Sequence, residues 1–116
     1  MKVLFIDDIR NPFNYIKDVN GVCIIQAKTY SAAIQALEDF TFDIIFFDHD
    51  LGEEKTGYDI AKYIVENQIE IKDGFKIHSA NPVGRSNIMQ LLTHYGYNYI
   101  GIWFLENFMI KYIYNL

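Results

Sequence analysis

The sequence predicts an α/β fold in which helices cover a parallel sheet. Strand-like segments alternate with amphipathic helical segments along the 116 residues. The strand-like segments, such as residues 3–6 and 44–47, are continuous apolar runs, which is typical of parallel strands buried on both faces. A hydrophobic content of 51% at this length suffices for the core of one domain spanning residues 1–116. We therefore expect a single-domain, doubly wound parallel sheet.

The predicted elements follow one another with short connections. Five strands are expected, at residues 2–6, 22–26, 44–47, 75–78 and 97–103. Helices are expected at residues 31–40, 58–68 and 86–95, and an apolar stripe over 104–113 predicts a last helix. Residues 9–21 are rich in Asn, Pro and Gly, which form turns rather than helices. We expect a loop there in place of the first crossover helix.

Composition narrows the classes of function. The net charge of −5 argues against an extended nucleic-acid surface, because such surfaces are basic. Cys23 is the only cysteine, so an internal disulfide is excluded, and its apolar surroundings predict a buried thiol. Neither a signal peptide nor an apolar run of roughly 18 residues is visible, so we expect a cytoplasmic protein without a membrane segment.

Three polar clusters each follow a predicted strand. They occupy residues 7–12, 48–52 and 78–85, and they contain both arginines of the chain, Arg10 and Arg85. Ligands of open α/β sheets bind beyond the carboxyl ends of the strands. If the three strands are parallel neighbours, the clusters meet there and form the candidate site.

Four carboxylates lie in these clusters: Asp7, Asp8, Asp48 and Asp50. Like charges at such proximity raise one another's pKa unless a cation compensates. Oxygen ligands favour Mg²⁺ or Mn²⁺, so the four residues are candidate ligands of one of these ions. The alternative is that some of them cap helices or stay solvated in loops.

His49 and His78 are candidate acid–base catalysts beside the carboxylate of Asp48, because imidazole titrates near neutral pH. One histidine would activate water, and the other would protonate the leaving oxygen. Alternatively, His49 is a surface loop residue and His78 is bonded to a neighbouring carbonyl.

Four further residues are candidate phosphate ligands. Arg10 and Arg85 offer the bidentate geometry that suits phosphate oxygens, and Arg85 lies near a predicted helix N-terminus. Ser79 and Asn81 can hydrogen-bond a phosphoryl oxygen. The alternatives are surface ion pairs for the arginines and turn or capping roles for Ser79 and Asn81.

These clusters resemble the response-regulator receiver fold over nearly the whole chain. The acidic pair Asp7-Asp8 ends the first strand, Asp48 stands in the place of the phosphoacceptor, Gly57 opens the next helix and Ser79 ends the fourth strand. The resemblance implies the flavodoxin- and receiver-like strand order 2-1-3-4-5. One departure is that residues 101–104 (GIWF) lack the lysine that ends the fifth strand of receivers. This difference argues against an ordinary phosphorelay role.

Three motifs look more like a smaller, receiver-like branch. They are Asp-Asp-x-Arg-x-Pro at 7–12, Asp-His-Asp-Leu-Gly at 48–52 and His-Ser-Ala-Asn-Pro-x-Gly at 78–84. The resemblance is to receiver-like domains proposed to process cyclic phosphates, found in bacteria and phages near RNA-repair or conflict genes. It implies a nucleotide or RNA 2′,3′-cyclic phosphate end as the ligand.

The interpretation that combines these observations is a metal-dependent cyclic phosphodiesterase. The metal and the arginines would stabilise the charge of the transition state. The alternative is a receiver-like module without turnover, which either binds phosphorylated nucleotides or is phosphorylated on Asp48. Whether the chain turns its ligand over stays open at this point. The resemblance further allows a homodimer through the C-terminal strand and helices.

Overall fold

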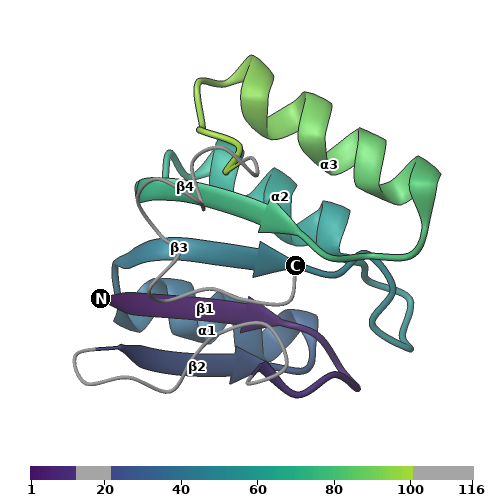
Figure 1. Cartoon of the computed structure of the whole chain (residues 1–116), viewed down its shortest axis with the longest axis horizontal. Coiled ribbons are helices and arrows are strands. Elements are labelled where there is room, and N and C mark those ends of the chain that lie inside the picture. The colour runs from purple at the N-terminus through teal and green to yellow at the C-terminus, as the bar shows by residue number, and fades with distance from the viewer. Residues whose placement is uncertain (13–21, 101–116) are drawn as a thin grey trace.

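The computed structural model describes residues 1–12 and 22–100, and its elements alternate as expected (Figure 1). They are β1 (Lys2–Ile6), β2 (Cys23–Ala27), α1 (Tyr30–Asp39), β3 (Phe42–Phe47), α2 (Gly57–Glu66), β4 (Ile71–Ile77) and α3 (Pro82–His94). This order confirms the α/β class. No helix in the described ranges is long and apolar enough to cross a membrane.

The strands form one parallel sheet in the order β2-β1-β3-β4. The order matches the first four positions of the prediction, and all four arrows point the same way in Figure 1. Within the described residues the sheet has four strands rather than the predicted five. Tyr99 makes a single parallel bridge to Phe75 on the outer side of β4, and Ile100 N donates to the Phe75 carbonyl at 2.8 Å. The pairing expected of a fifth strand thus begins at this point.

Several predictions fall outside the described residues. They are the end of the fifth strand at 101–103, the last helix at 104–113, most of the loop at 9–21 and the homodimer surface of the C-terminal segment.

The sheet buries side chains on both faces. Leu4, Ile6, Ile45, Phe47 and Ile77 share a core with residues of α1, α2 and α3. Val3, Phe5, Ile44 and Phe46 form a second cluster with Ile100 on the other face. All three described helices cover the first face, with α1 and α2 behind the sheet in Figure 1.

Short polar side chains fix where the helices begin. Thr29 caps α1 by accepting from Ala32 N at 3.1 Å. Asn81 caps α3 by accepting from Gly84 N at 3.0 Å, and Pro82 occupies the first helical position, where its missing N–H costs nothing. Helix α3 therefore starts four residues before the predicted Ser86.

Cys23 corrects one prediction. It is exposed, not buried in the core. It is the first residue of β2, which is the outermost strand on that side of the sheet. An apolar run at the start of an edge strand therefore does not imply burial on both sides.

Candidate functional site

The three polar clusters meet beyond the carboxyl ends of β1, β3 and β4, which we call the carboxyl edge. The hydrogen bonds of the sheet continue one residue past each strand. Asp7 N donates to Ala27 O at 3.1 Å, Asp48 N to Ile6 O at 2.9 Å and His78 N to Phe47 O at 3.0 Å. The first residue of each loop is thus held by the neighbouring strand, so the side chains of the three clusters are fixed relative to one another.

A cavity of about 370 Å³ opens at this edge. Its lining comes from all three clusters and consists of Asp7, Asp8, Ile9, Arg10, Asp48, Asp50, Gly52, Ser79 and Ala80. We call it the acidic cavity. It contains all four predicted metal ligands and two of the four predicted phosphate ligands, Arg10 and Ser79. The other predicted site residues, His49, His78, Asn81 and Arg85, do not line it.

Asp7 is buried and heavily hydrogen-bonded. Its Oδ1 accepts from the backbone N–H groups of Ile9 at 2.8 Å and Arg10 at 2.9 Å. Its Oδ2 faces His78 Nε2 at 2.8 Å and Arg10 Nη1 at 3.4 Å. Burial alone would raise the pKa of Asp7, but the hydrogen bonds from Arg10, Ile9 and His78 outweigh it and lower the pKa. Asp7 is therefore a fixed negative charge at the base of the site.

Asp48 is the opposite case. Burial and the negative charge of Asp7 raise its pKa, and Arg10, the Ser79 hydroxyl and the His49 backbone N–H offset the rise only in part. Its carboxylate lies 3.9 Å from Arg10 Nη1 and is 10% exposed. A buried carboxylate that is costly to ionise is one that a cation would stabilise.

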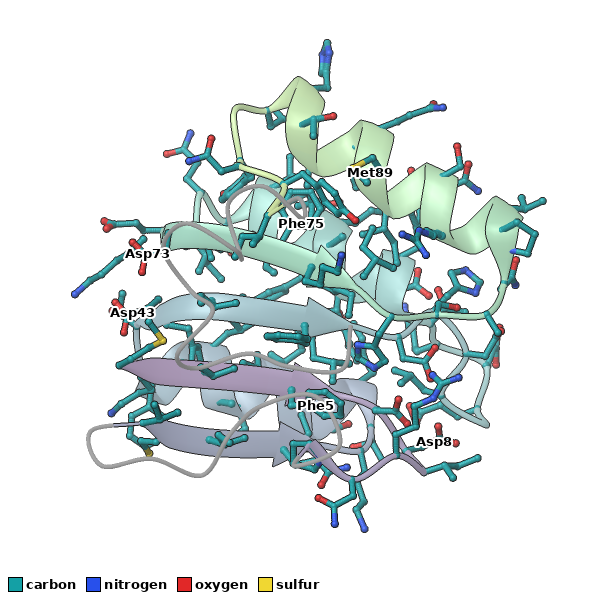
Figure 2. The ribbon with its side chains drawn as sticks, in the orientation of Figure 1. Phe5, Asp8, Asp43, Asp73, Phe75 and Met89 are labelled. Carbon is teal, nitrogen blue, oxygen red and sulfur yellow. The ribbon has the colours of Figure 1, made fainter. Side chains whose placement is uncertain are left out.

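Asp7, Asp8 and Asp48 can hold a metal ion. Each offers an oxygen, and the three oxygens lie within 4.8 Å of one another. Figure 2 shows Asp8 just beyond the end of β1. Three carboxylate oxygens beside an open cavity suit Mg²⁺ or Mn²⁺, which keep water in their remaining positions. Asp50, the fourth predicted ligand, lines the cavity but is not part of this group.

His78 lies beneath the site. Its side chain is 3% exposed, and its ring stacks on Phe5 with centroids 4.6 Å apart and planes 6° from parallel. Burial lowers the pKa of His78 to about 4, although the neighbouring Asp7 carboxylate acts to raise it. The ring is therefore neutral at pH 7, and Nε2–H donates to Asp7.

His49 forms a separate polar group at the rim with Asp50 and Asn81. Its Nδ1 lies 2.9 Å from Asp50 Oδ1, and Asn81 Nδ2 donates to Asp50 Oδ2 at 3.4 Å. The hydrogen bond with His49 lowers the pKa of Asp50. A carboxylate on Nδ1 fixes the tautomer that has its lone pair on Nε2, which is the arrangement of a general base.

Two glycines let the backbone approach the site closely. A Cβ at Gly84 would lie 2.3 Å from Cγ of His49, so the imidazole packs directly on the first turn of α3. A Cβ at Gly57 would lie 1.9 Å from the carbonyl oxygen of Asp48, and Gly57 N donates to His49 O at 2.8 Å. The start of α2 therefore fixes the loop that carries Asp48 and His49.

Arg85 lies away from the acidic cavity. From the first turns of α3 its Nη2 donates to the Tyr99 hydroxyl at 3.4 Å, and Lys76 Nζ donates to the same oxygen at 3.3 Å. Sequence reasoning did not single out Lys76 or Tyr99. The signal for Lys76 was a charged residue inside an otherwise apolar strand segment, and no comparable signal marked Tyr99.

Comparison with solved structures supports the fold. The chain superposes on RcsB from Salmonella enterica serovar Typhimurium, solved bound to promoter rprA with the phosphomimetic BeF3−, at a TM-score of 0.55 and 17% identity over 78% of this chain. A fusion that carries the yeast Spc42 trimeric coiled coil gives a TM-score of 0.56 and 24% identity over 78% of this chain. The chain spans 55% and 62% of those two proteins, respectively. No curated protein matches the chain.

These likenesses show that the chain shares the α/β fold of both structures. The family model described as the cyclic-phosphate processing receiver domain matches residues 2–94, which is most of the chain. The chain belongs to this family, as the three motifs predicted.

Proposed function

We propose that the protein hydrolyses a cyclic phosphate ester with the help of a divalent cation bound at the acidic cavity. The observation that carries this proposal is the convergence of Asp7, Asp8 and Asp48 beside Arg10 in one cavity. Membership of a cyclic-phosphate processing family supports the choice of substrate. A 2′,3′-cyclic phosphate on a nucleotide or an RNA end is the substrate we propose.

Arg10 would bind the phosphate together with the cation. Its side chain is 35% exposed at the cavity and is held by Asp7 at 3.4 Å and by the His78 carbonyl at 3.2 Å. Without positive charge, three carboxylates would repel an anionic ester. A bound Mg²⁺ or Mn²⁺ would supply that charge and polarise a phosphoryl oxygen.

His49 would accept the proton of the attacking water. The water oxygen would bond to phosphorus while one of the two ring P–O bonds breaks, and the released ribose oxygen would take up a proton. With its Nδ1 held by Asp50, His49 offers Nε2 for the proton from water and could return it to the leaving oxygen.

His78 is better suited to positioning than to proton transfer. The sequence predicts it, with His49, as one of two acid–base groups. Its burial, its pKa of about 4 and its bond to Asp7 favour a role in orienting the Asp7 carboxylate. The assignment of His78 as an acid–base group stays a prediction, and kinetics of His78→Gln would decide it.

A substrate screen tests the hydrolase. It covers cyclic mononucleotides, cyclic dinucleotides and RNA with a 2′,3′-cyclic end, each with Mg²⁺, Mn²⁺ or EDTA. We expect turnover of one class with metal and none with EDTA. His49→Gln should reduce turnover about 10²–10⁴-fold while leaving substrate affinity unchanged, because a general base acts in the transition state. His94→Gln, on the exposed end of α3, is the matched control and should have no effect.

The second candidate is a module that binds its ligand or is phosphorylated on Asp48. It is favoured by the placement of Asp48 at the end of β3, hydrogen-bonded to Ser79 and facing the cavity. If the protein binds cyclic phosphates tightly but forms no hydrolysis product over hours with either metal, this candidate is supported and the hydrolase proposal is contradicted. Transfer of phosphate from a small phosphodonor to the wild type but not to Asp48→Asn would support phosphorylation.

A further inference from the structure

Lys76 is a buried cation outside the acidic cavity. It lies inside β4 and is 8% exposed. Its Nζ donates to the Tyr99 hydroxyl at 3.3 Å and lies 5.3 Å from the centre of the Tyr99 ring. Tyr99 is itself held in place, because its ring packs edge-on against Phe75, which Figure 2 labels on β4. A buried ammonium group is costly unless an anion compensates its charge.

Arg85 brings a second positive charge to the same oxygen. Its Nη2 donates to the Tyr99 hydroxyl at 3.4 Å from the first turns of α3. Two cations that share one neutral oxygen repel each other. In the part of the chain that the structure describes, the ion pairs involve Arg10, His49 and His78 only, so neither Lys76 nor Arg85 meets a carboxylate there.

In this cluster of Lys76, Arg85 and Tyr99, the two cationic side chains donate and the Tyr99 hydroxyl oxygen accepts both hydrogen bonds. A phenol oxygen can accept two hydrogen bonds, and its own O–H must then be donated elsewhere. The ammonium and guanidinium groups have no acceptor function and keep further N–H groups after bonding to Tyr99. Among the described contacts of the three residues, the only acceptor is the Tyr99 oxygen itself. The cluster therefore offers convergent donors and two positive charges to an anion.

We propose that Lys76, Tyr99 and Arg85 form a second oxyanion site that binds a phosphate group. Phosphate supplies several acceptor oxygens and up to two negative charges, which match the donors and charges of the cluster. None of the three residues lines the acidic cavity. Lys76 lies near the end of β4 and precedes Ser79, in the following loop, by three residues, which is about 10 Å of extended chain. One phosphate group cannot fill both places.

The phosphate group has two sources with the same chemistry. It can be free inorganic phosphate, or it can be the phosphodiester next to a terminal cyclic phosphate in an oligonucleotide. The second source rests on the proposed function, and the first does not.

Titration with inorganic phosphate in EDTA tests the site itself. Without a divalent cation the acidic cavity repels phosphate, so binding reports on the cationic cluster. We expect saturable binding by calorimetry and a phosphate-dependent rise in Tm. Lys76→Met, Arg85→Gln and Tyr99→Phe should each weaken the affinity at least about tenfold, because hydrogen bonds to charged groups contribute that much. Lys72→Met, an exposed lysine at the start of β4, is the control and should leave it unchanged.

Other results of the phosphate titration would contradict the proposed oxyanion site. Unchanged phosphate affinity in Tyr99→Phe, which keeps the aromatic ring, would overturn the proposal. So would the absence of phosphate binding in wild type. None of these results bears on turnover at the acidic cavity, which is measured separately with metal present.

The two sources are separated by a kinetic comparison. If the neighbouring phosphodiester is the ligand, wild type should show a lower KM for a dinucleotide with a 2′,3′-cyclic end than for the cyclic mononucleotide, and Lys76→Met should abolish that difference. If free phosphate is the ligand, the KM ratio should be the same in both proteins.

Discussion

The two ends of the sheet both carry carboxylates, but among the described residues only one end gathers three of them into a possible metal site. At the amino edge, where the strands begin, Asp43 accepts from Lys2 N at 2.7 Å, and Asp73 has its pKa raised by burial and by Asp43, with Lys72 offsetting the rise. Figure 2 shows Asp43 and Asp73 at the end of the molecule opposite Asp8. These two acids thus have a backbone donor and a lysine as their neighbours.

At the carboxyl edge the acids converge on a cavity instead. Asp7, Asp8 and Asp48 come within 4.8 Å of one another, and Arg10 is the cation that pairs with Asp7 and Asp48. The difference comes from topology, because parallel strands direct the first residue of each following loop to one place. Acidic residues alone therefore do not define the site.

The largest effect on folding should come from the backbone contact that supports the carboxyl edge. Gly57→Ala should destabilise the protein by about 3 kcal/mol or more, because its Cβ would overlap the Asp48 carbonyl, which cannot move without the sheet. Gly84→Ala is the matched comparison. Its Cβ meets the side chain of His49, which can rotate, so about 1 kcal/mol is expected. Urea unfolding of both variants checks the contrast, and equal losses would contradict it.

The next effect is the pH dependence that His78 confers. Burial lowers its pKa from 6.5 to about 4, so between these pH values the unfolded chain binds a proton that the folded chain does not. Stability should be unaffected by His78 above pH 6.5 and should fall by roughly 3 kcal/mol as the pH drops to 4. The lowered pKa of Asp7 adds a further loss below about pH 3.8.

Urea unfolding of the wild type and of His78→Gln at pH 7 and pH 4.5 measures this dependence. The variant should lose stability at pH 7 but show a much weaker dependence on pH. The same dependence in both proteins would mean that His78 is not the buried group that titrates.

The smallest effect concerns the charge of Asp48. Because burial and Asp7 raise its pKa, ionised Asp48 costs stability above its folded pKa, and that cost vanishes at low pH where the group is protonated. Asp48→Asn should therefore raise Tm at pH 7 in EDTA by a few degrees, which corresponds to a free energy of unfolding on the order of 1 kcal/mol higher. Near pH 3 the substitution should leave Tm unchanged. Differential scanning fluorimetry suffices, and a lower Tm at pH 7 would show that Asp48 is well stabilised without a cation.

Much of the fold followed from the sequence because apolar runs report burial directly. The predicted strand 2–6 is observed as Lys2–Ile6, and the strand predicted at 44–47 begins two residues earlier, at Phe42. Strand β4 begins at Ile71, whereas the prediction began at residue 75. The prediction started late because polar Lys72 and Asp73 interrupt the apolar pattern of the strand. Segment boundaries depend on caps such as Asn81, whose partner three residues later cannot be read with certainty from one sequence.

The convergence of the acidic residues was predicted from the sequence, but the internal pairing of the candidate site was not. The convergence of Asp7, Asp8 and Asp48 follows from topology, and the chain order of the motifs sufficed to predict it. The separation of the two histidines could not be predicted in this way. His78 enters the layer of Phe5 and Phe46, whereas His49 lies on Gly84 and pairs with Asp50. Which face of the sheet a residue takes after the strand ends is decided by packing, and packing is not visible in the motif.

Metal binding at the two ends of the sheet tests the central claim most directly. Isothermal calorimetry with Mn²⁺ should give one weak site per chain in the wild type, weakened at least about tenfold in Asp8→Asn and Asp48→Asn, because each removes a charged ligand. Asp43→Asn and Asp73→Asn, at the amino edge, should bind Mn²⁺ as the wild type does. If the amino-edge variants lose the ion, or if Asp48→Asn keeps full affinity, the carboxyl edge is not the metal site and the account is wrong.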